Sequence, residues 1–298
     1  MLYFKNLSEG SGLNEQLQIQ WGPAVILAAY VILLVLETLS PLRGRKLPRK
    51  GRFLVNASMT VLVFITGGLI VRTVGLYLAA WAEAKPFGLL HIAAIPGWAR
   101  FALGFGLMDL SFYYWHRINH ELPILWRFHN VHHADPDMDV TTSFRFHLVE
   151  VLYSTGFRAL QVLITGVSPF TYAVYEIFFA CETAFHHSNL RLPVRVESLL
   201  NKIIVTPRMH GIHHSFVMEE TNSNYSTIFR WWDWLHGTLD LGVPQKDITI
   251  GVPAYSLPED DGFVRLNVMP FEKQRDYWRL PDGGIKKRGT HDRRAMAE

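Results

Sequence analysis

The sequence has a single cysteine, Cys181, among 298 residues. The chain therefore cannot form an intrachain disulfide or a thiolate cluster, so nitrogen or oxygen atoms must hold any bound metal ion. The His-Glu-x-x-His motif of zinc hydrolases is also missing. So are a glycine-rich dinucleotide or flavin fingerprint and a Cys-x-x-Cys-His haem attachment motif. These absences argue against a zinc hydrolase and against a built-in electron-transfer cofactor.

The sequence also lacks a strong excess of charge, since the net charge is +3 with neutral histidines. The basic residues gather in two short runs, residues 43–52 and 286–294. Such runs are typical of segments that anchor a protein beside a membrane, and we favour that interpretation here. Nothing in the sequence indicates nucleic-acid binding.

Long apolar stretches, by contrast, are plentiful, and 49% of the residues are hydrophobic. A helix that crosses a bilayer needs about 20 mostly apolar residues. Three stretches meet this need: residues 22–41, 54–81 and 98–118. Residues 148–185 are long enough for a fourth span or for a helical hairpin that enters and returns. From about Leu190 the chain is more polar and is expected to form a soluble cap. We therefore predict an all-α integral membrane protein with about four spanning helices and a helical cap.

The basic loop at residues 41–52 predicts the orientation of the chain. It contains six lysines and arginines and no acid, which places it on the cytoplasmic side. Counting spans from there puts residues 116–147 on the same side, and a returning hairpin at 148–185 brings His186 to that side as well. The metal site and the basic C-terminal tail are thus predicted to be cytoplasmic, with a bacterial inner membrane as the location.

Three histidine clusters dominate the sequence and contain eight of its fourteen histidines. They are His116-x-x-x-His120, His129-x-x-His132-His133 and His210-x-x-His213-His214. Residues spaced by three and four positions share one face of a helix, so each cluster directs its imidazoles together. An all-imidazole site suits iron, copper, zinc or nickel. Because one tetrahedral zinc needs only four ligands, eight or more histidines fit two ions.

Helix signals and one acid accompany these clusters. Pro123 and Pro207 occupy positions where proline favours the start of a helix. Asp109 precedes Tyr113, His116 and His120 at spacings that give one polar stripe on an apolar helix. An acid inside a span indicates function. Asp109 could accept a hydrogen bond from a metal-binding histidine, or could pair with Arg72 of the second span, and one network could include both.

With these motifs the chain resembles the fatty acid hydroxylase / sterol desaturase superfamily of membrane di-iron oxygenases, over about residues 100–240. It looks most similar to bacterial members. The pieces that match, besides the histidine clusters, are Met138-Asp139-Val140-Thr141-Thr142, Arg145-Phe146-His147-Leu148-Val149-Glu150, His187-Ser188-Asn189, Pro207-Arg208-Met209-His210, Thr221-Asn222-Ser223-Asn224-Tyr225 and Trp232-Asp233-Trp234-Leu235. Three residues depart from the usual pattern: Leu148, His186 and His236.

The resemblance implies a set of metal ligands, namely His116, His120, His129, His132, His133, His210, His213 and His214, with His187 as a ninth. His186 is a further candidate, because adjacent helical residues diverge by about 100° and either of the two could bind metal. Asp109, His147 and Glu182 are the candidate catalytic residues. Glu182 lies one turn before His186 and could bind metal or support a ligand. His147 could line the pocket or be a core histidine.

The resemblance also implies a reaction. Two iron ions would use dioxygen as co-substrate to hydroxylate a C–H bond of a lipid. Electrons would come from a separate reductase of the cytochrome b5, ferredoxin or flavin type. A desaturase, an alkylglycerol-type ether monooxygenase and a non-enzymatic membrane metal-binding protein are the alternatives. The expected organisation is residues 1–98 as the N-terminal membrane unit, 99–240 as the catalytic domain and 241–298 as the tail.

Overall fold

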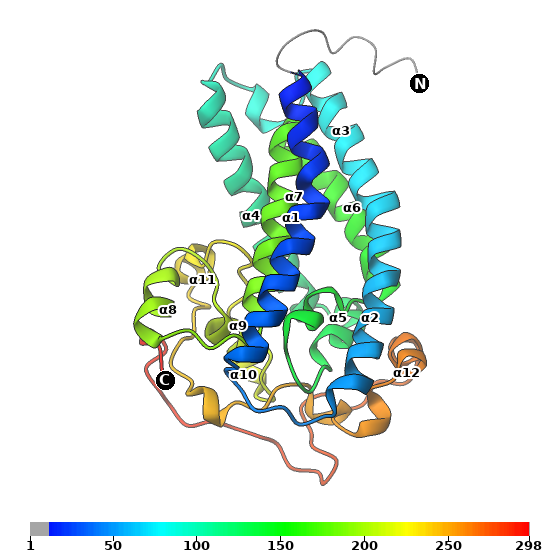
Figure 1. Ribbon diagram of the computed structural model, residues 1–298, viewed down its shortest axis with the longest axis vertical. Coiled ribbons are helices and arrows are strands. Elements are labelled where there is room, and N and C mark those ends of the chain that lie inside the picture. The colour runs from blue at the N-terminus through cyan, green and yellow to red at the C-terminus, as the bar shows by residue number, and fades with distance from the viewer. Residues whose placement is uncertain (1–11, 298) are drawn as a thin grey trace.

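A computed structural model describes residues 12–297, and all regular elements in this range are helices. The extended pairings within these residues are isolated bridges, such as that of Ile204 with Phe229. Long helices form a bundle at one end of the molecule, and short helices and loops form a cap at the other (Figure 1). The prediction of an all-α fold is confirmed.

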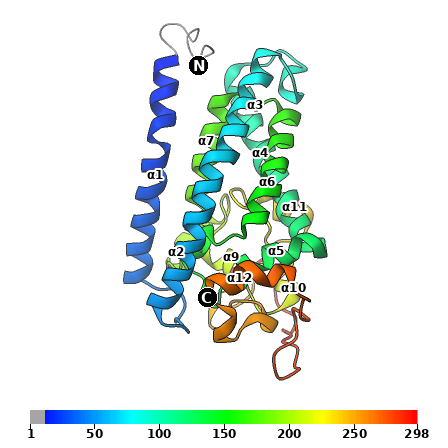
Figure 2. The same cartoon turned by 90° about the vertical axis from the view of Figure 1, so that its right-hand side faces the viewer.

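Five helical segments build the bundle. They are α1 (Gly12–Leu39), the continuous run of α2 (Arg49–Thr66), η2 (Gly67–Val71) and α3 (Arg72–Ala84), then α4 (Gly97–Glu121), α6 (Leu148–Thr165) and α7 (Pro169–His187). The η2 segment is one π-helical stretch, which begins at a glycine pair where the chain can widen without a side-chain clash. Both α3 and α4 pack against α6 and α7, and α1 packs along α7 at one edge of the bundle (Figure 2).

The predicted helical hairpin over residues 148–185 is formed by α6 and α7, which run in opposite directions (Figure 1). Gly166 ends α6 in the left-handed conformation with φ of 71°, which favours glycine. A Cβ atom at this position would also lie 2.3 Å from the Phe87 carbonyl oxygen. Ser168 then caps α7 by accepting a hydrogen bond from the Thr171 amide at 3.1 Å, and Pro169 opens the helix.

Two helical segments are long and apolar enough to cross a membrane, Trp21–Leu39 and Lys50–His91. Most of their side chains are not buried in the protein. Within the described residues, the third and fourth predicted spans do not meet this criterion. Charged and polar residues lower the mean hydropathy of α4, α6 and α7, and two of them, Arg158 and Glu176, pair with each other at 3.1 Å. Two of the predicted spans are thus supported by length and hydropathy.

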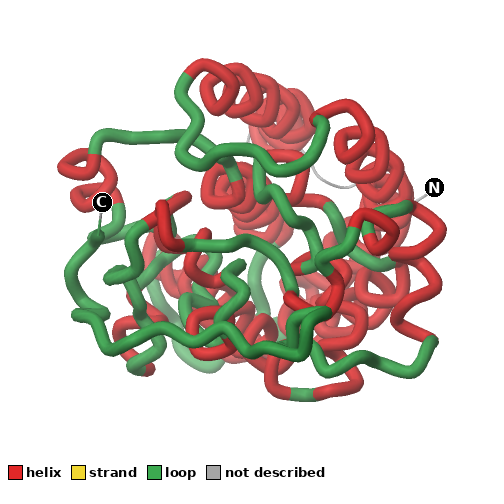
Figure 3. The backbone as a smooth tube through the Cα atoms, turned by 90° about the horizontal axis from the view of Figure 1, so that it is seen from below, coloured by secondary structure: helices red, strands yellow, loops and turns green. Residues whose placement is uncertain are grey.

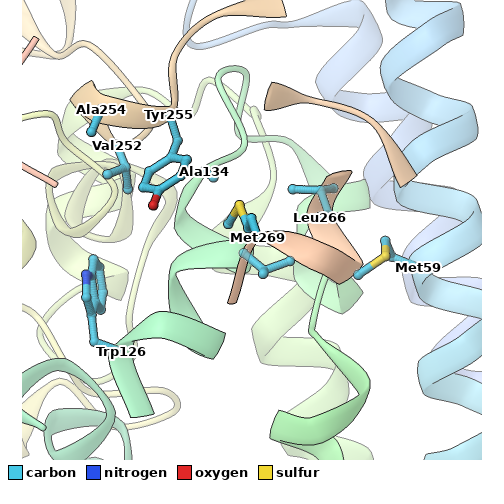
Figure 4. Packing of buried hydrophobic residues seen from close by; sticks show 9 residues of the cluster. Met59, Trp126, Ala134, Val252, Ala254, Tyr255, Leu266 and Met269 are labelled. Carbon is cyan, nitrogen blue, oxygen red and sulfur yellow. The ribbon is translucent and has the colours of Figure 1, made fainter. Parts of the chain in front are cut away.

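The cap lies at the lower end of the bundle, where its loops pass in front of the long helices in the view from below (Figure 3). Its helices are α5 (Pro123–His133), α8 (Val194–Leu200), α9 (Pro207–His213), α10 (Met218–Thr221), α11 (Trp231–His236) and α12 (Phe263–Val268). Its short 3₁₀ turns are η4 (Val140–Phe144), η5 (Gln245–Asp247), η6 (Pro253–Tyr255), η7 (Pro258–Asp260) and η8 (Met269–Phe271), whereas η3 (Leu89–His91) joins α3 to α4 at the other end of the bundle. The cap was predicted to begin at about Leu190, but α5 and η4 also belong to it. Met59 of α2, Trp126 of α5 and Leu266 of α12 belong to one buried hydrophobic cluster, which joins the cap to the bundle (Figure 4).

The basic loop between α1 and α2 lies against the cap. Arg43 donates to the Gln245 side chain at 2.7 Å, and Arg45 donates to Asp139 at 3.3 Å. Arg52, at the start of α2, makes 2.6 Å bonds to both Asp135 and Asp139. Membrane anchoring was the favoured interpretation of this run, and it stays a prediction, because the contacts of these arginines with cap residues do not test it. The contacts place the basic loop and the cap at the same end of the molecule.

Candidate metal centre

Eight buried histidines meet below the bundle in two groups of four. The first group is His116, His120, His133 and His213, and the second is His132, His187, His210 and His214. Within each group, one nitrogen of every member lies within 4.8 Å of the nitrogens of the others. The histidines of the first group come from α4, α5 and α9, and those of the second come from α5, α7 and α9, so three separate helix ends have to pack correctly to form each group.

Helical geometry explains how adjacent histidines reach different groups. Consecutive residues on a helix point about 100° apart. His132 and His133, at the end of α5, therefore face different neighbours and belong to the second and first groups respectively. His213 and His214 at the end of α9 divide in the same way. Each His-x-x-His-His motif thus supplies both groups and fixes one relative to the other.

The distances between ring nitrogens match a shared metal ion. The Nε2 atom of His187 lies 2.9 Å from that of His132 and 3.0 Å from that of His210. The Nε2 atoms of His116 and His213 are 3.2 Å apart. Imidazole nitrogens bind such ions at about 2.0–2.1 Å, so neighbouring ligands lie about 2.9–3.4 Å apart. The observed separations fall in this range.

Buried ring nitrogens without hydrogen-bond partners among the described residues also indicate a metal site. Both ring nitrogens of His120 and the Nε2 atom of His133 are buried and have no hydrogen-bond partner among the described residues. An unsatisfied buried polar atom costs about 1–3 kcal/mol. A metal ion would satisfy a nitrogen at each residue, so this donor set fits metal ions of the imidazole-binding kind.

Backbone carbonyls orient several of the rings. The Nδ1 atom of His116 lies 2.8 Å from the Tyr225 carbonyl, and that of His213 lies 2.7 Å from the Ser223 carbonyl. His187 Nδ1 is 2.7 Å from the Thr183 carbonyl. Because a carbonyl only accepts, each Nδ1 carries the proton and each Nε2 offers a lone pair.

Burial also keeps the ligand rings neutral. Burial lowers the pKa of His213 to about 3, although the backbone carbonyls of Ser223 and Thr221 act to raise it. Burial and the neighbouring imidazoles hold the pKa values of His210 and His214 well below the usual value. A neutral imidazole is the form that binds metal, so these rings need no deprotonation near pH 7.

The two remaining predicted ligands adjoin the groups without being members of them. The ring centroid of His129 lies 4.9 Å from that of His133 and 5.0 Å from that of His120, so His129 borders the first group. His186 lies 4.1 Å from His210, centroid to centroid, and borders the second group. All ten predicted histidines therefore converge in one region.

Glu150 of α6 supports His129, a role that sequence reasoning missed. Its Oε1 atom accepts a hydrogen bond from His129 Nδ1 at 2.7 Å, and both side chains are buried. The Nε2 atom on the other side of the His129 ring is buried and has no hydrogen-bond partner among the described residues. The sequence signal was present, because Glu150 lies at the end of a segment that matches the superfamily.

Replacing Glu150 with alanine is expected to weaken metal binding about 10–100-fold, because the ring of His129 loses its orienting carboxylate. Glu150→Gln should lie between this variant and the intact chain, since the amide oxygen still accepts a hydrogen bond. Competition with a chelator for bound iron measures the affinity. Glu121→Gln, which alters an exposed surface pair with Arg117, is the matched control. Unchanged affinity in a folded Glu150→Ala chain would contradict the role of Glu150.

Asp109 does not support a histidine. Its carboxylate accepts hydrogen bonds from the Ile228 and Phe229 amides at 3.3 and 3.0 Å and from Trp232 Nε1 at 2.7 Å. Among the described residues it bonds neither a metal-group histidine nor Arg72, so both predicted partners were wrong. Asp109 instead holds the segment that leads into α11.

His147 and Glu182 also lie outside the two groups. His147 caps α6, because its Nδ1 accepts from the Val149 amide at 3.1 Å, and its Nε2 lies 3.2 Å from the Asn267 carbonyl. This is the structural alternative considered for His147. Glu182 has a buried Oε1 atom with no partner among the described residues, and it makes no hydrogen bond to His186.

Asp233 is a second residue that sequence reasoning did not single out. It accepts hydrogen bonds from the Tyr225 and Ser226 amides, both at 2.8 Å, and from the Thr238 hydroxyl at 2.6 Å. These bonds fix the loop whose Tyr225 carbonyl orients His116. Asp233 thus positions the first group through the backbone.

Residues 101–238 match the family model described as fatty acid hydroxylase. The chain is 26% identical to ornithine lipid hydroxylase OlsE of Rhizobium tropici, over 88% of this chain and 78% of that protein. It is 30% identical to alkylglycerol monooxygenase of Danio rerio, over 61% of this chain and 39% of that protein. It is 28% identical to human cholesterol 25-hydroxylase, over 45% of this chain and 48% of that protein. The match thus spans less than half the length of the latter two relatives. No solved structure matches the chain.

Proposed function

Because the chain belongs to the fatty acid hydroxylase superfamily, we propose that it is an oxygen-dependent lipid hydroxylase with two iron ions. The observation that carries the proposal is the pair of four-histidine groups buried at the base of an apolar bundle. In the proposed reaction one atom of dioxygen is inserted into a C–H bond of a lipid, and the other leaves as water with two protons and two electrons from a separate reductase. A desaturase would use the same site.

The residues that would hold the ions are the two groups of four, with His129 and His186 beside them. Bound iron would supply the redox chemistry that lets dioxygen attack an unactivated C–H bond. The protein's own contribution is to fix the rings through Glu150 and the backbone carbonyls, and to surround them with buried residues that exclude water. All ten histidines lie at one end of the bundle. A metal carrier would instead be expected to place ligands through the depth of the spans.

An apolar cleft whose lining includes Phe185, the residue before His186, is the proposed binding site of the lipid chain. It has a volume of about 510 Å³ and lies between α1, α4, α7 and the loops around residues 204 and 228. Its lining residues are Ala29, Ile32, Leu33, Phe105, Phe178, Cys181, Glu182, Phe185, Ile204, Ile228 and Phe229. A concave, mostly apolar site of this size is typical of ligand pockets.

The proposed setting is a membrane, with the cap on the cytoplasmic side of a bacterial inner membrane. The outer faces of the bundle support this, since Leu27 is 64% exposed and Leu69 is 70% exposed. In this proposal residues 1–98 form the membrane unit, 99–240 the catalytic domain and 241–298 the tail. The four-span count also stays part of the proposal.

Lipid mass spectrometry of host membranes tests the function. Membranes that contain the intact chain should gain a lipid heavier by one oxygen, and the double variant His132→Ala, His213→Ala should not produce it. A lipid that loses two hydrogens would instead identify a desaturase. A chain that holds iron yet yields neither product, in a host given a reductase and candidate lipids, would contradict the proposal.

A further inference from the structure

Glu182 differs from the other acids of the bundle. Glu37 accepts hydrogen bonds from backbone amides, and Asp109 accepts hydrogen bonds from three donors. Glu176 forms an ion pair with Arg158. Neither carboxylate oxygen of Glu182 has a hydrogen-bond partner among the described residues, and Oε1 is fully buried. An unpaired acid in an apolar setting costs free energy, so such a residue indicates a functional contact.

The surroundings of Glu182 indicate what would satisfy it. It lies in the apolar cleft, where every other lining residue is hydrophobic except the thiol of Cys181. No lysine, arginine or histidine among the described residues lines the cleft, so this part of the chain supplies no cation there. A molecule that occupies the cleft is then the expected source of the donor.

Resting on the proposed function, we infer that Glu182 selects the substrate by binding an N–H or O–H donor on the lipid. The apolar lining of the cleft contacts the hydrocarbon chain, and the Glu182 carboxylate binds an ammonium or hydroxyl group. Glu182 lies four residues before His186 on α7, about 6 Å along the helix axis. The polar group of the substrate is thereby held beside the second histidine group, and the substrate class is an amphiphile rather than a plain hydrocarbon.

The chain carries its own reporter for this contact. Cys181 is its single cysteine, is partly exposed and lines the same cleft. A molecule that fills the cleft should therefore protect Cys181 from a thiol reagent. Labelling rates can be measured on the purified full-length chain in detergent, with and without bound iron, and Cys181→Ala gives the background.

The probes are dodecylamine, dodecanol and the donor-free dodecyl methyl ether. We expect the amine or the alcohol to protect Cys181 at about tenfold lower concentration than the ether, because a hydrogen bond to a charged group is among the stronger kinds. If the amine protects Cys181 better than the alcohol does, the group that binds Glu182 is an ammonium. If the alcohol protects Cys181 as well as the amine does, a hydroxyl group is sufficient. Glu182→Leu should remove the preference, and the isosteric Glu182→Gln should reduce it.

Glu219→Gln, at an exposed acid on the cap, is the matched control and should keep the preference. Equal protection by all three probes, or a preference that persists in Glu182→Leu, would overturn the inference. Iron content measured on the same preparations separates the two proposals. Two irons with no donor preference contradict the role of Glu182 alone, whereas a donor preference in a chain that binds no iron contradicts the proposed oxygenase.

Discussion

Removing two histidines from one group is expected to lower the iron content from two ions per chain to about one. The double variant His120→Ala, His213→Ala empties half of the first group, and His187→Ala, His210→Ala does the same to the second. Two remaining nitrogens hold an ion far more weakly than four. Since loss of a supporting contact alone costs about 10–100-fold, oxygenation should fall by more than about 100-fold in both variants.

Elemental analysis of the purified chains counts the ions, and lipid mass spectrometry measures the product. His236→Ala is the control, because His236 lies outside both groups and bonds the Tyr114 hydroxyl at 2.7 Å. It should keep two irons. Loss of both ions in either double variant would show that the groups do not bind independently. A single zinc ion in the intact chain would contradict the two-iron proposal.

The convergence of the histidine motifs could be predicted from the sequence, whereas the division of the rings between two groups could not. That these rings bind metal stays a prediction. Spacings of three and four place His129, His132 and His133 near one face of a helix, and Pro123 marks where that helix starts. Which group each ring joins depends on how α5 packs against α4, α7 and α9. That packing is a tertiary property without a local sequence signal.

The partners of the site residues were harder still to predict. The carbonyls of Tyr225 and Ser223 orient two rings, but any residue has a carbonyl, so no residue type identifies them. Asp109 was given the wrong partners for a related reason. Its donors lie 119 or more residues away in the chain, and only the folded loop brings them to α4. The sequence shows that a buried acid needs a partner but not which one.

The basic loop illustrates the same limit. A run of lysines and arginines without acids is typical of a membrane edge. Here the acids that pair with Arg52 lie more than 80 residues later, next to the second histidine motif. The basic run can both bind the cap and lie beside a membrane, because its cap contacts hold it at the end of the bundle where a membrane surface would lie.

Replacing Arg52 with methionine is expected to destabilise the fold by about 3–5 kcal/mol. Arg52 is 3% exposed and binds Asp135, Asp139 and Thr142. Its loss would leave two buried carboxylates without their main partner. The same bonds join α2 to the segment that follows α5, so the variant should also hold iron less tightly.

A matched set of variants separates this cost from a general effect of mutation. Arg52→Lys keeps the charge but loses the bidentate geometry, so it should be destabilised by less than Arg52→Met. Arg117→Met breaks an exposed pair with Glu121, and such pairs contribute about 0–1 kcal/mol. Denaturant titration of the purified chain in detergent gives the free energies of unfolding.

Adding Asp135→Leu to Arg52→Met should restore part of the stability, because it removes one of the uncompensated charges. Arg145 keeps its 2.7 Å contact with Asp261 in this double variant. A double variant less stable than Arg52→Met would show that Asp135 stabilises the cap through its other contacts, with the Asn56 and Thr142 side chains, more than through Arg52.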